Sequence, residues 1–427
     1  MAQQRVSFEW VMDDDPIAPW QGARDETAPD APAREAFWMG RLGRVLSLVL
    51  AAFCLTTGVG LTHDQQAQLI AQEGIEFALN QENLAWRTRD RGLFETLIDP
   101  DVDDEWRDEW RDHWRSGAEA AGDYEAQLLY VQAADGWIEA TVMTQQPALE
   151  WWQTSPYRET RFYRRVGQSW LRSAPPAASW GERSRLETAH LAFEYYTKDE
   201  AAVRAAATTL ERAYGELYPL LGLPLPTESP KLTIQVMPAP VGRWTPARNE
   251  LDVMSPRLAQ IPLGQSEAEY LAYDVMGWFT YRALRDATPG AAGRYLYRWP
   301  ILVWGLRGWL RDDLLDQPSP WRAEARRVFQ EAAPQYLPLG LSNLTELEGD
   351  GRPTRQQVIM RYIAAESFVS FVVATYGRER LPDLLKALIH HGSWEEIATD
   401  LYGHSVEKLV ADWNVYLLAE YGTEAAP

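Results

Sequence analysis

The chain has only one cysteine, Cys54, in 427 residues, so no disulfide can form within it. Histidine is also scarce. Of the six histidines, no two have the i, i+4 spacing that places two metal ligands on one helix face. There is no glycine-rich phosphate loop, and no Gly-x-Ser tripeptide is followed by the second glycine of a nucleophile elbow. The sequence therefore lacks the standard motifs of disulfide frameworks, helical zinc sites, nucleotide binding and serine hydrolysis.

The chain has fewer positive than negative residues: 41 are Lys or Arg and 61 are Asp or Glu, which gives a formal net charge of −20. An acidic surface argues against nucleic acid as a partner, and its ordinary role is solubility. Apolar residues are plentiful, since hydrophobic side chains make up 46% of the chain and 20 residues are Trp. This composition and length predict two or three folded domains with substantial cores.

One apolar run near the N-terminus, residues 45–61, carries no charge over 17 residues. That length is at the short end for a membrane-spanning helix. Three Arg precede the run and Asp64 follows it. The positive-inside rule therefore predicts a transmembrane signal anchor over 41–62 in a single-pass cell-membrane protein. The N-terminus is then cytoplasmic, and the domains from residue 63 onward are extracytoplasmic.

Other interpretations of this run stay open. Gly58-Val59-Gly60 fits a signal-peptidase site, which would release the protein. Cys54 is a candidate for lipidation, although Phe53 stands where a small residue is expected. We favour the anchor because a leader of about 40 residues is long for a cleaved signal. Residues 1–40 contain several Pro and Asp and few aliphatic side chains, which predicts a disordered cytoplasmic tail.

Residues 63–175 show helical patterns first and strand patterns afterwards. An amphipathic helix is expected over Gln65–Arg89, and the residues expected on its apolar side are Leu69, Ile70, Ile75, Phe77 and Leu84. Trp106, Trp110 and Trp114 recur at every fourth position of a charged helix. From Tyr124 the period changes to two, which predicts an antiparallel meander. Helices followed by a meander indicate an α+β fold. The expected strands are 124–131, 137–144, 157–166 and 169–173.

The end of this region, YRETRFYRRVGQSWLRSAP, resembles the last hairpin of the nuclear-transport-factor-two-like (cystatin-like) fold. The earlier segment LFETLIDP is similar to the same family. The resemblance implies a cone-shaped α+β domain over 63–175. It implies no particular function, because enzymes, ligand pockets and dimerisation modules share that fold.

Residues 176–186 contain Pro176 and Gly181 and predict a linker. The rest of the chain, 187–427, begins with a few strands and ends with helices only. Strands are expected at 187–196, 231–237 and 251–254. Helices are expected at 199–221, 266–284, 299–315, 356–376, 380–390, 394–402 and 406–421.

This order of elements resembles the gluzincin metallopeptidases, in particular peptidase-MA-like proteins. The similar segments are KLTIQVMP, a strand that runs into Ser255-Pro256, ATYGRERLPDLLKAL and YGHSVEKLVADWNVYL. The resemblance covers 187–427. It implies a mostly α-helical, thermolysin-like domain with a small N-terminal sheet.

The zinc motif itself is replaced. Within SEAEYLAYDVMGWFTYRAL, Tyr273 and Asp274 stand where the family has its first His and its catalytic Glu, and Gly277 stands at the second His. Trp304, just before Gly305-Leu306, stands at the third ligand. Zinc requires nitrogen, sulfur or carboxylate donors, which Tyr, Gly and Trp do not supply. The resemblance therefore implies a degenerate, catalytically inactive domain without a metal or cofactor.

Aromatic residues occupy the expected substrate cleft. Tyr270, Trp278 and Trp299 would line it, and they either plug the cleft or form a hydrophobic binding groove; we expect the plug. The stripe that begins at Trp106 is expected to be core or interface, with stacking on sugars or peptides as the alternative.

The first functional hypothesis is a membrane-anchored, extracytoplasmic, non-catalytic protein that binds or scaffolds an unknown protein or peptide partner. It would contact the membrane through residues 45–61 and would not bind nucleic acid. The alternative is a hydrolase that uses non-standard residues in the same cleft, with Asp274 as its carboxylate and Tyr273 or Glu269 assisting. A third hypothesis places a small-molecule pocket in the cone-shaped domain.

Overall fold

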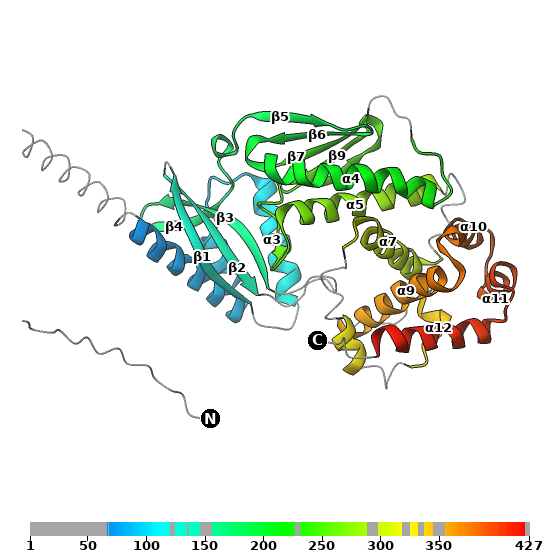
Figure 1. The fold of residues 1–427 in the computed structure, drawn as a ribbon. Coiled ribbons are helices and arrows are strands. Elements are labelled where there is room, and N and C mark those ends of the chain that lie inside the picture. The colour runs from blue at the N-terminus through cyan, green and yellow to red at the C-terminus, as the bar shows by residue number, and fades with distance from the viewer. Residues whose placement is uncertain are drawn as a thin grey trace, which may run out of the picture. The chain divides into compact units, whose positions relative to one another are not determined.

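The computed structural model of the chain describes residues 66, 68–119, 124–134, 136–145, 156–226, 231–287, 298–317, 325–331, 337–344 and 355–422. They belong to one compact unit, Gln66–Pro427. The unit combines helices with two separate sheets, which confirms the α+β class (Figure 1). The expected tail and anchor, residues 1–40 and 41–62, lie outside the described residues.

Within the described part of the chain, one helix is long and apolar enough to cross a membrane by length and composition. It is α9 (Arg355–Tyr376), over the window Ile359–Tyr376, and 67% of that window is buried inside the protein. α9 packs against α7 (Pro300–Leu315) and α12 (Val406–Tyr421). Burial among other helices is typical of a core helix that is apolar all round.

The first sheet confirms the expected meander. Its strands follow one another along the chain as antiparallel neighbours, in the order β1-β2-β3, with β4 paired to β3. Their bounds are β1 (Glu125–Ala134), β2 (Trp137–Gln145), β3 (Tyr157–Val166) and β4 (Ser169–Ser173). A short strand that the sequence did not indicate, β10 (Ile261–Pro262), also pairs with β3. The second half of the chain therefore returns to the first sheet.

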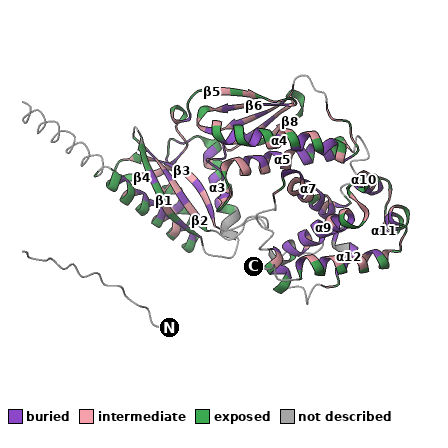
Figure 2. Cartoon of the chain, viewed as in Figure 1, coloured by how far each residue is buried: buried purple, intermediate pink, exposed green. Residues whose placement is uncertain are grey.

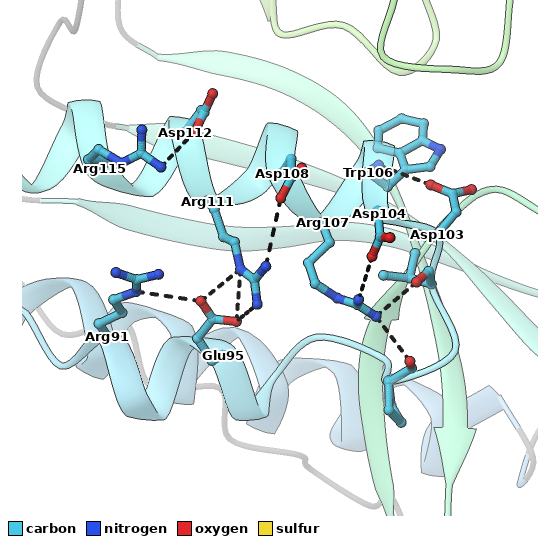
Figure 3. A network of polar contacts seen from close by, with 12 residues as sticks. Arg91, Glu95, Asp103, Asp104, Trp106, Arg107, Asp108, Arg111, Asp112 and Arg115 are labelled. Atoms are coloured by element: carbon cyan, nitrogen blue, oxygen red, sulfur yellow. Dashed lines mark hydrogen bonds and ion pairs between the residues drawn. The ribbon is translucent and has the colours of Figure 1, made fainter.

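Among the described residues, three helices precede this sheet: one over residues 68–88, α2 (Arg91–Thr96) and α3 (Asp104–Glu119). Polar contacts fix α3 against α2 (Figure 3). The Arg111 guanidinium donates to both oxygens of Glu95 at 2.8–3.1 Å, and Arg107 donates to the Val102 carbonyl at 2.8 Å. Asp103 caps the helix by accepting from the Trp106 backbone N–H at 3.0 Å. These contacts set the orientation in which α3 presents its Trp stripe.

The helix over 68–88 forms where it was expected, but it buries a different face. Of the five residues expected on its apolar side, Ile75 is buried as predicted. The other four, Leu69, Ile70, Phe77 and Leu84, are exposed, Phe77 by 64%. The buried face carries smaller side chains and Trp86. Its members are Ala71, Ile75, Ala78, Leu79, Ala85 and Trp86. Small residues allow the helix to lie close to its neighbours, so size and not hydrophobicity alone decided the face.

The segment expected to be a linker, 176–186, is part of the fold. Ala177–Trp180 forms a short 3₁₀ helix, and Trp180 is fully buried in the core of the first sheet. The following residues form β5 (Arg183–Glu187), which pairs with β6 (Leu191–Tyr196) as an antiparallel hairpin. The single strand expected at 187–196 is therefore one arm of a hairpin.

The second sheet has the order β5-β6-β7-β9-β8. β7 (Leu232–Met237) runs parallel to both β6 and β9 (Glu250–Met254), while β8 (Gly242–Thr245) is an antiparallel edge strand that the sequence did not indicate. β7 and β9 lie where they were expected. The parallel β6–β7 pair needs a crossover, and α4 (Glu200–Leu220) supplies it.

α4 and α5 (Glu267–Asp286) lie side by side along the second sheet (Figure 1). α5 packs against α7, α7 against α9, and α9 against α12. The same helical part contains α10 (Leu381–His390) and α11 (Trp394–Ile397). The π-helix Ala398–Tyr402 continues α11. One large core joins this sheet to these helices, and the purple faces in Figure 2 mark their buried residues. The helix positions confirm the sequence predictions to within a few residues.

Candidate functional site

A cavity of about 930 Å³ lies between α3 and the first sheet on one side and α5, α7 and α9 on the other. Aromatic side chains from several elements contribute to its walls. Trp106 and Trp110 come from α3, Trp278 from α5, Trp304 from α7 and Tyr362 from α9. A concave, aromatic chamber with a few charged groups is the usual form of a ligand site.

The four positions singled out by the missing zinc motif converge on this cavity. Tyr273, Asp274 and Gly277 line it from α5, and Trp304 lines it from α7. α5 is fixed at its start by a capping box in which Ser266 and Glu269 satisfy each other's backbone N–H. The helix therefore presents one face, from residue 270 to residue 281, to the cavity.

The three aromatic residues expected to line the cleft separate into two groups. Tyr270 and Trp278 do line the cavity. Trp299 lies in the helical core instead: it is 2% exposed, its indole N–H donates to the Leu388 carbonyl at 3.1 Å, and its ring meets Trp394 edge-on. Trp299 is the N-cap residue of α7, so its side chain anchors the start of that helix.

The aromatic residues surround a space and do not fill it. Trp304 and Tyr281 are 43% and 44% exposed and both line the cavity. The expectation that the cleft is plugged is therefore wrong, and the alternative of an open groove describes the structure. Trp106 and Trp110 are buried in the first core, as expected for their stripe, and they also line the cavity. Their stacking on sugars or peptides stays a prediction.

Two arginines on α7 occupy the space next to Tyr273 and Gly277. The Arg311 guanidinium lies over the Tyr273 ring, with Cζ 3.5 Å from the ring centroid. Arg307 donates to the Gly277 carbonyl at 3.2 Å. A Cβ atom at Gly277 would lie 3.8 Å from Arg311 Nη1, in ordinary van der Waals contact with this guanidinium. Positive charge therefore stands beside the positions where the resemblance predicts metal ligands.

Asp274 is the carboxylate of this wall. Burial raises its pKa to about 6, and the nearby Arg311 only partly opposes that shift. Burial also raises the pKa of Tyr270, with the charge of Asp274 adding to the effect. A carboxyl group that titrates near pH 6 accepts or donates protons under ordinary conditions, which is the chemistry that a general base requires.

Glu269, the second candidate for such chemistry, is committed to the helix cap. Its Oε2 accepts from the Ser266 backbone N–H at 2.7 Å and from the Ser266 hydroxyl at 2.8 Å. These hydrogen bonds hold the pKa of Glu269 below its ordinary value. Glu269 is not among the residues that line this cavity, whereas Asp274 is.

The opposite wall is held by a buried ionic network. Arg161 donates to Glu159 at 2.6 Å, to Glu82 at 2.8 Å and to the Tyr124 hydroxyl at 2.9 Å. Burial would raise the pKa of Glu159, but the charges of Arg161 and Arg172 outweigh it and bring that pKa to about 2. Glu159 and Arg172 also line the cavity, so this network stiffens the wall that faces α5.

The residues of the cavity do not fit a zinc ion. Tyr273, Gly277 and Trp304 bring no imidazole, thiolate or carboxylate to the three ligand positions. Within the described residues, no group of three His, Cys, Asp or Glu side chains is arranged to hold a metal. Arg311 also places a positive charge there, which opposes cation binding. We derive no metal-dependent step for this site.

Comparison with protein-family models finds no matching family, and comparison with curated proteins finds no match.

Proposed function

We propose that the chain is a membrane-anchored, extracytoplasmic binding protein that takes up a protein or peptide segment in the cavity without cleaving it. The region over 187–427 is, in this proposal, a gluzincin-like domain that has lost its zinc site. The region over 63–175 is the cone-shaped domain, and its α3 completes the binding chamber. Residues 41–62 are the signal anchor.

One observation carries the proposal: Tyr273, Gly277 and Trp304 line a single open cavity to which several further aromatic side chains contribute. Aromatic side chains contribute large contact areas with few rotamers to order, which suits binding of apolar side chains. The same replacement removes the donors on which zinc-dependent hydrolysis depends. The cavity therefore supports binding of a ligand, and it lacks the donors that metal-dependent cleavage would need.

The rival function, hydrolysis through Asp274, rests on the pKa of about 6 for that carboxyl group. A base alone is insufficient, because acyl transfer also needs donors that stabilise the developing oxyanion. The two arginines of α7 are candidates for that role, so the rival deserves a direct test. Asp274→Asn abolishes any cleavage in the rival mechanism and leaves binding in place in ours.

The test uses the full chain in detergent micelles, mixed with a casein digest of known peptide composition. We expect retention of peptides rich in apolar side chains, with unchanged masses after elution, and no stoichiometric zinc by elemental analysis. A Trp278→Ala/Trp304→Ala variant should retain markedly less peptide. A Trp170→Ala variant is the control, because Trp170 lies outside the cavity lining.

New peptide termini that disappear in Asp274→Asn would replace the binding proposal with the rival. Zinc lost on chelation together with casein cleavage would overturn it as well. Protease added to intact cells tests the location: we expect digestion of the region from residue 63 onward, and full protection of that region would contradict the proposed orientation.

A further inference from the structure

Arg307 and Arg311 lie one helical turn apart on α7, and both line the cavity. They reach different parts of α5: Arg311 covers the Tyr273 ring, and Arg307 lies beside Tyr281, with Cζ 5.5 Å from the ring centroid. Like charges at this spacing repel one another. The neighbouring Arg311 adds to burial in lowering the pKa of Arg307.

Arg307 is not neutralised within the described residues. No carboxylate there lies at ion-pair distance from it; its one hydrogen bond is to the Gly277 carbonyl, and its Nε is buried without a partner. Arg311 has only a distant carboxylate, with Nε 3.9 Å from Asp312 Oδ1. Arg172, on the opposite wall, is within 3.7 Å of both Glu82 and Glu159. The cavity therefore contains one charge-balanced wall and one wall with positive charge in excess.

A half-buried guanidinium without an anion is costly, and a ligand anion would offset that cost. The fork of an arginine matches a carboxylate, which can accept two parallel N–H bonds. Around the pair, Tyr281 and Trp304 expose their rings to the cavity. The group bound next to the anion is therefore apolar.

The acidic residues of the cavity do not cancel this positive wall. Glu159 is already paired with Arg161, and Glu109 lies across the cavity on α3. Asp274 is beyond ion-pair distance of Arg311 and has no hydrogen bond from another described residue. Its carboxyl oxygens are therefore free to accept an N–H from a ligand, which selects a ligand with such a donor near its anion.

We propose that Arg307 and Arg311 form a carboxylate subsite, and that the ligand is an N-acylated amino acid with an apolar side chain, either free or as the C-terminus of a peptide. Such a group has a carboxylate for the arginine pair, an N–H for Asp274 and an apolar side chain for Tyr281 and Trp304. This inference rests on the proposed binding function and specifies which end of a peptide the cavity accepts.

Two matched pairs of probes test it by titration calorimetry on the full chain in detergent micelles: acetyl-phenylalanine with its amide, and acetyl-Ala-Ala-Phe with its amide. Each pair differs only in the terminal charge. We expect each acid to bind about tenfold or more tightly than its amide, as charge-assisted hydrogen bonds require. Equal affinity of acetyl-phenylalanine and acetyl-Ala-Ala-Phe indicates that the ligand is a free N-acylated amino acid. Tighter binding of the tripeptide acid indicates the C-terminus of a peptide.

Arg307→Gln should weaken binding of the acid far more than binding of the amide and so remove the preference for the acid, while Arg307→Lys should keep part of the preference. Arg204→Gln is the matched control, because Arg204 is an exposed helical arginine of α4 paired with Glu200. An unchanged unfolding midpoint of Arg307→Gln shows that the fold is intact. If the variant unfolds, the comparison of acid and amide binding to the wild-type chain still tests the carboxylate subsite.

Acid and amide that bind equally well would overturn the carboxylate subsite while leaving the proposed binding function standing. Retention of the acid preference in a folded Arg307→Gln would overturn it too. If neither member of either pair binds, the subsite is rejected, and the casein-peptide experiment shows separately whether peptide binding fails with it.

Discussion

The guanidinium of Arg311 lies over the Tyr273 ring, with 3.5 Å between Cζ and the ring centroid, and joins α7 to α5 at the cavity wall. A cation at this distance from an aromatic face contributes about 0.5–2 kcal/mol, more when it is shielded from water. The side chain of Arg311 is 20% exposed, so this contact is largely shielded from water. The contact both supports the wall and fixes the position of one proposed ligand-binding group.

We predict a coupling of about 1 kcal/mol between these two side chains in a double-mutant cycle of Tyr273→Leu and Arg311→Met. Chemical denaturation of the four proteins measures it. The comparison cycle uses Arg307 and Tyr281, whose centroid distance is 5.5 Å and whose ring is 44% exposed, and should give less than about 0.5 kcal/mol. Equal coupling in the two cycles would contradict the role we give to the shielded contact.

We predict that Gly→Ala changes the stability of the chain in opposite directions at positions 277 and 305. Gly277→Ala should stabilise the chain by about 0.5–1 kcal/mol, because Ala is the better helix former and the nearest atom lies 3.8 Å from the new Cβ. Gly305→Ala should destabilise it by about 1–3 kcal/mol, because its Cβ would lie 2.5 Å from the Ala365 backbone of α9. Thermal unfolding compares them, and a stable Gly305→Ala would show that α7 and α9 are less closely packed.

Trp299 and Trp304, five residues apart, provide a second matched pair. Trp299→Phe should cost about 1–3 kcal/mol, because it leaves the Leu388 carbonyl without its donor in the core. Trp304→Phe should change stability by less than about 0.5 kcal/mol, since the side chain is 43% exposed, but should weaken retention of casein peptides. Denaturation and peptide retention are measured on both variants. The reverse pattern would place Trp299, and not Trp304, at the binding surface.

The sequence predicts helices and strands well here because their signals are local. The strands at 157–166 and 169–173 have the expected bounds, and α5 begins at the Ser266 cap that its sequence indicates. The short strands β8 and β10 were missed, since two to four residues carry no periodicity of their own and depend on the strand they pair with. The buried face of the helix over 68–88 was predicted only in part, because large apolar side chains are expected inside whereas the small Ala71, Ala78 and Ala85 are buried there.

The site was predictable only in part. Tyr270, Tyr273, Asp274, Gly277, Trp278 and Trp304 were placed together by the resemblance, and the cavity brings them together. Arg307 and Arg311 were missed, although two arginines one turn apart in the otherwise apolar WGLRGWLRDD are a usable signal. No sequence pattern indicated that α3 would line the cavity, because its position there depends on how the first sheet and the helices pack. Trp299 was misplaced because a buried and a cavity-lining Trp look alike in sequence.

We predict that ionisation of Asp274 lowers the stability of the folded chain as the pH rises. Burial brings its folded-state pKa to about 6, above the ordinary 3.8, so the folded chain binds more protons than the unfolded chain between these values. The free energy of unfolding therefore decreases from pH 4 to pH 6. Asp274→Asn removes this loss and should be more stable than the wild type by about 1–2 kcal/mol at pH 7, allowing for solvent in the cavity.

Urea denaturation at pH 4, 5, 6 and 7 measures this difference. Asp199, whose pKa burial also raises to about 6, titrates in both proteins and cancels from the comparison. The two proteins should have nearly equal stability at pH 4. A difference that is constant across the whole range would show that Asp274 does not change its protonation there.

We predict that Glu159 makes the opposite contribution, so that stability falls as the pH is lowered. Its folded-state pKa of about 2 lies below the ordinary 4.5, so its charged form stabilises the fold above pH 4.5 and this contribution is lost as the pH falls toward 2. Glu159→Gln should cost about 3 kcal/mol at pH 7, because it leaves Arg161 with a single buried carboxylate, Glu82. The cost should shrink as the pH is lowered from 4.5 to 3. Urea denaturation measures it, with the exposed Glu125→Gln as the control that should show neither effect; a cost independent of pH would mean that lost packing, and not the ion pair, accounts for the change.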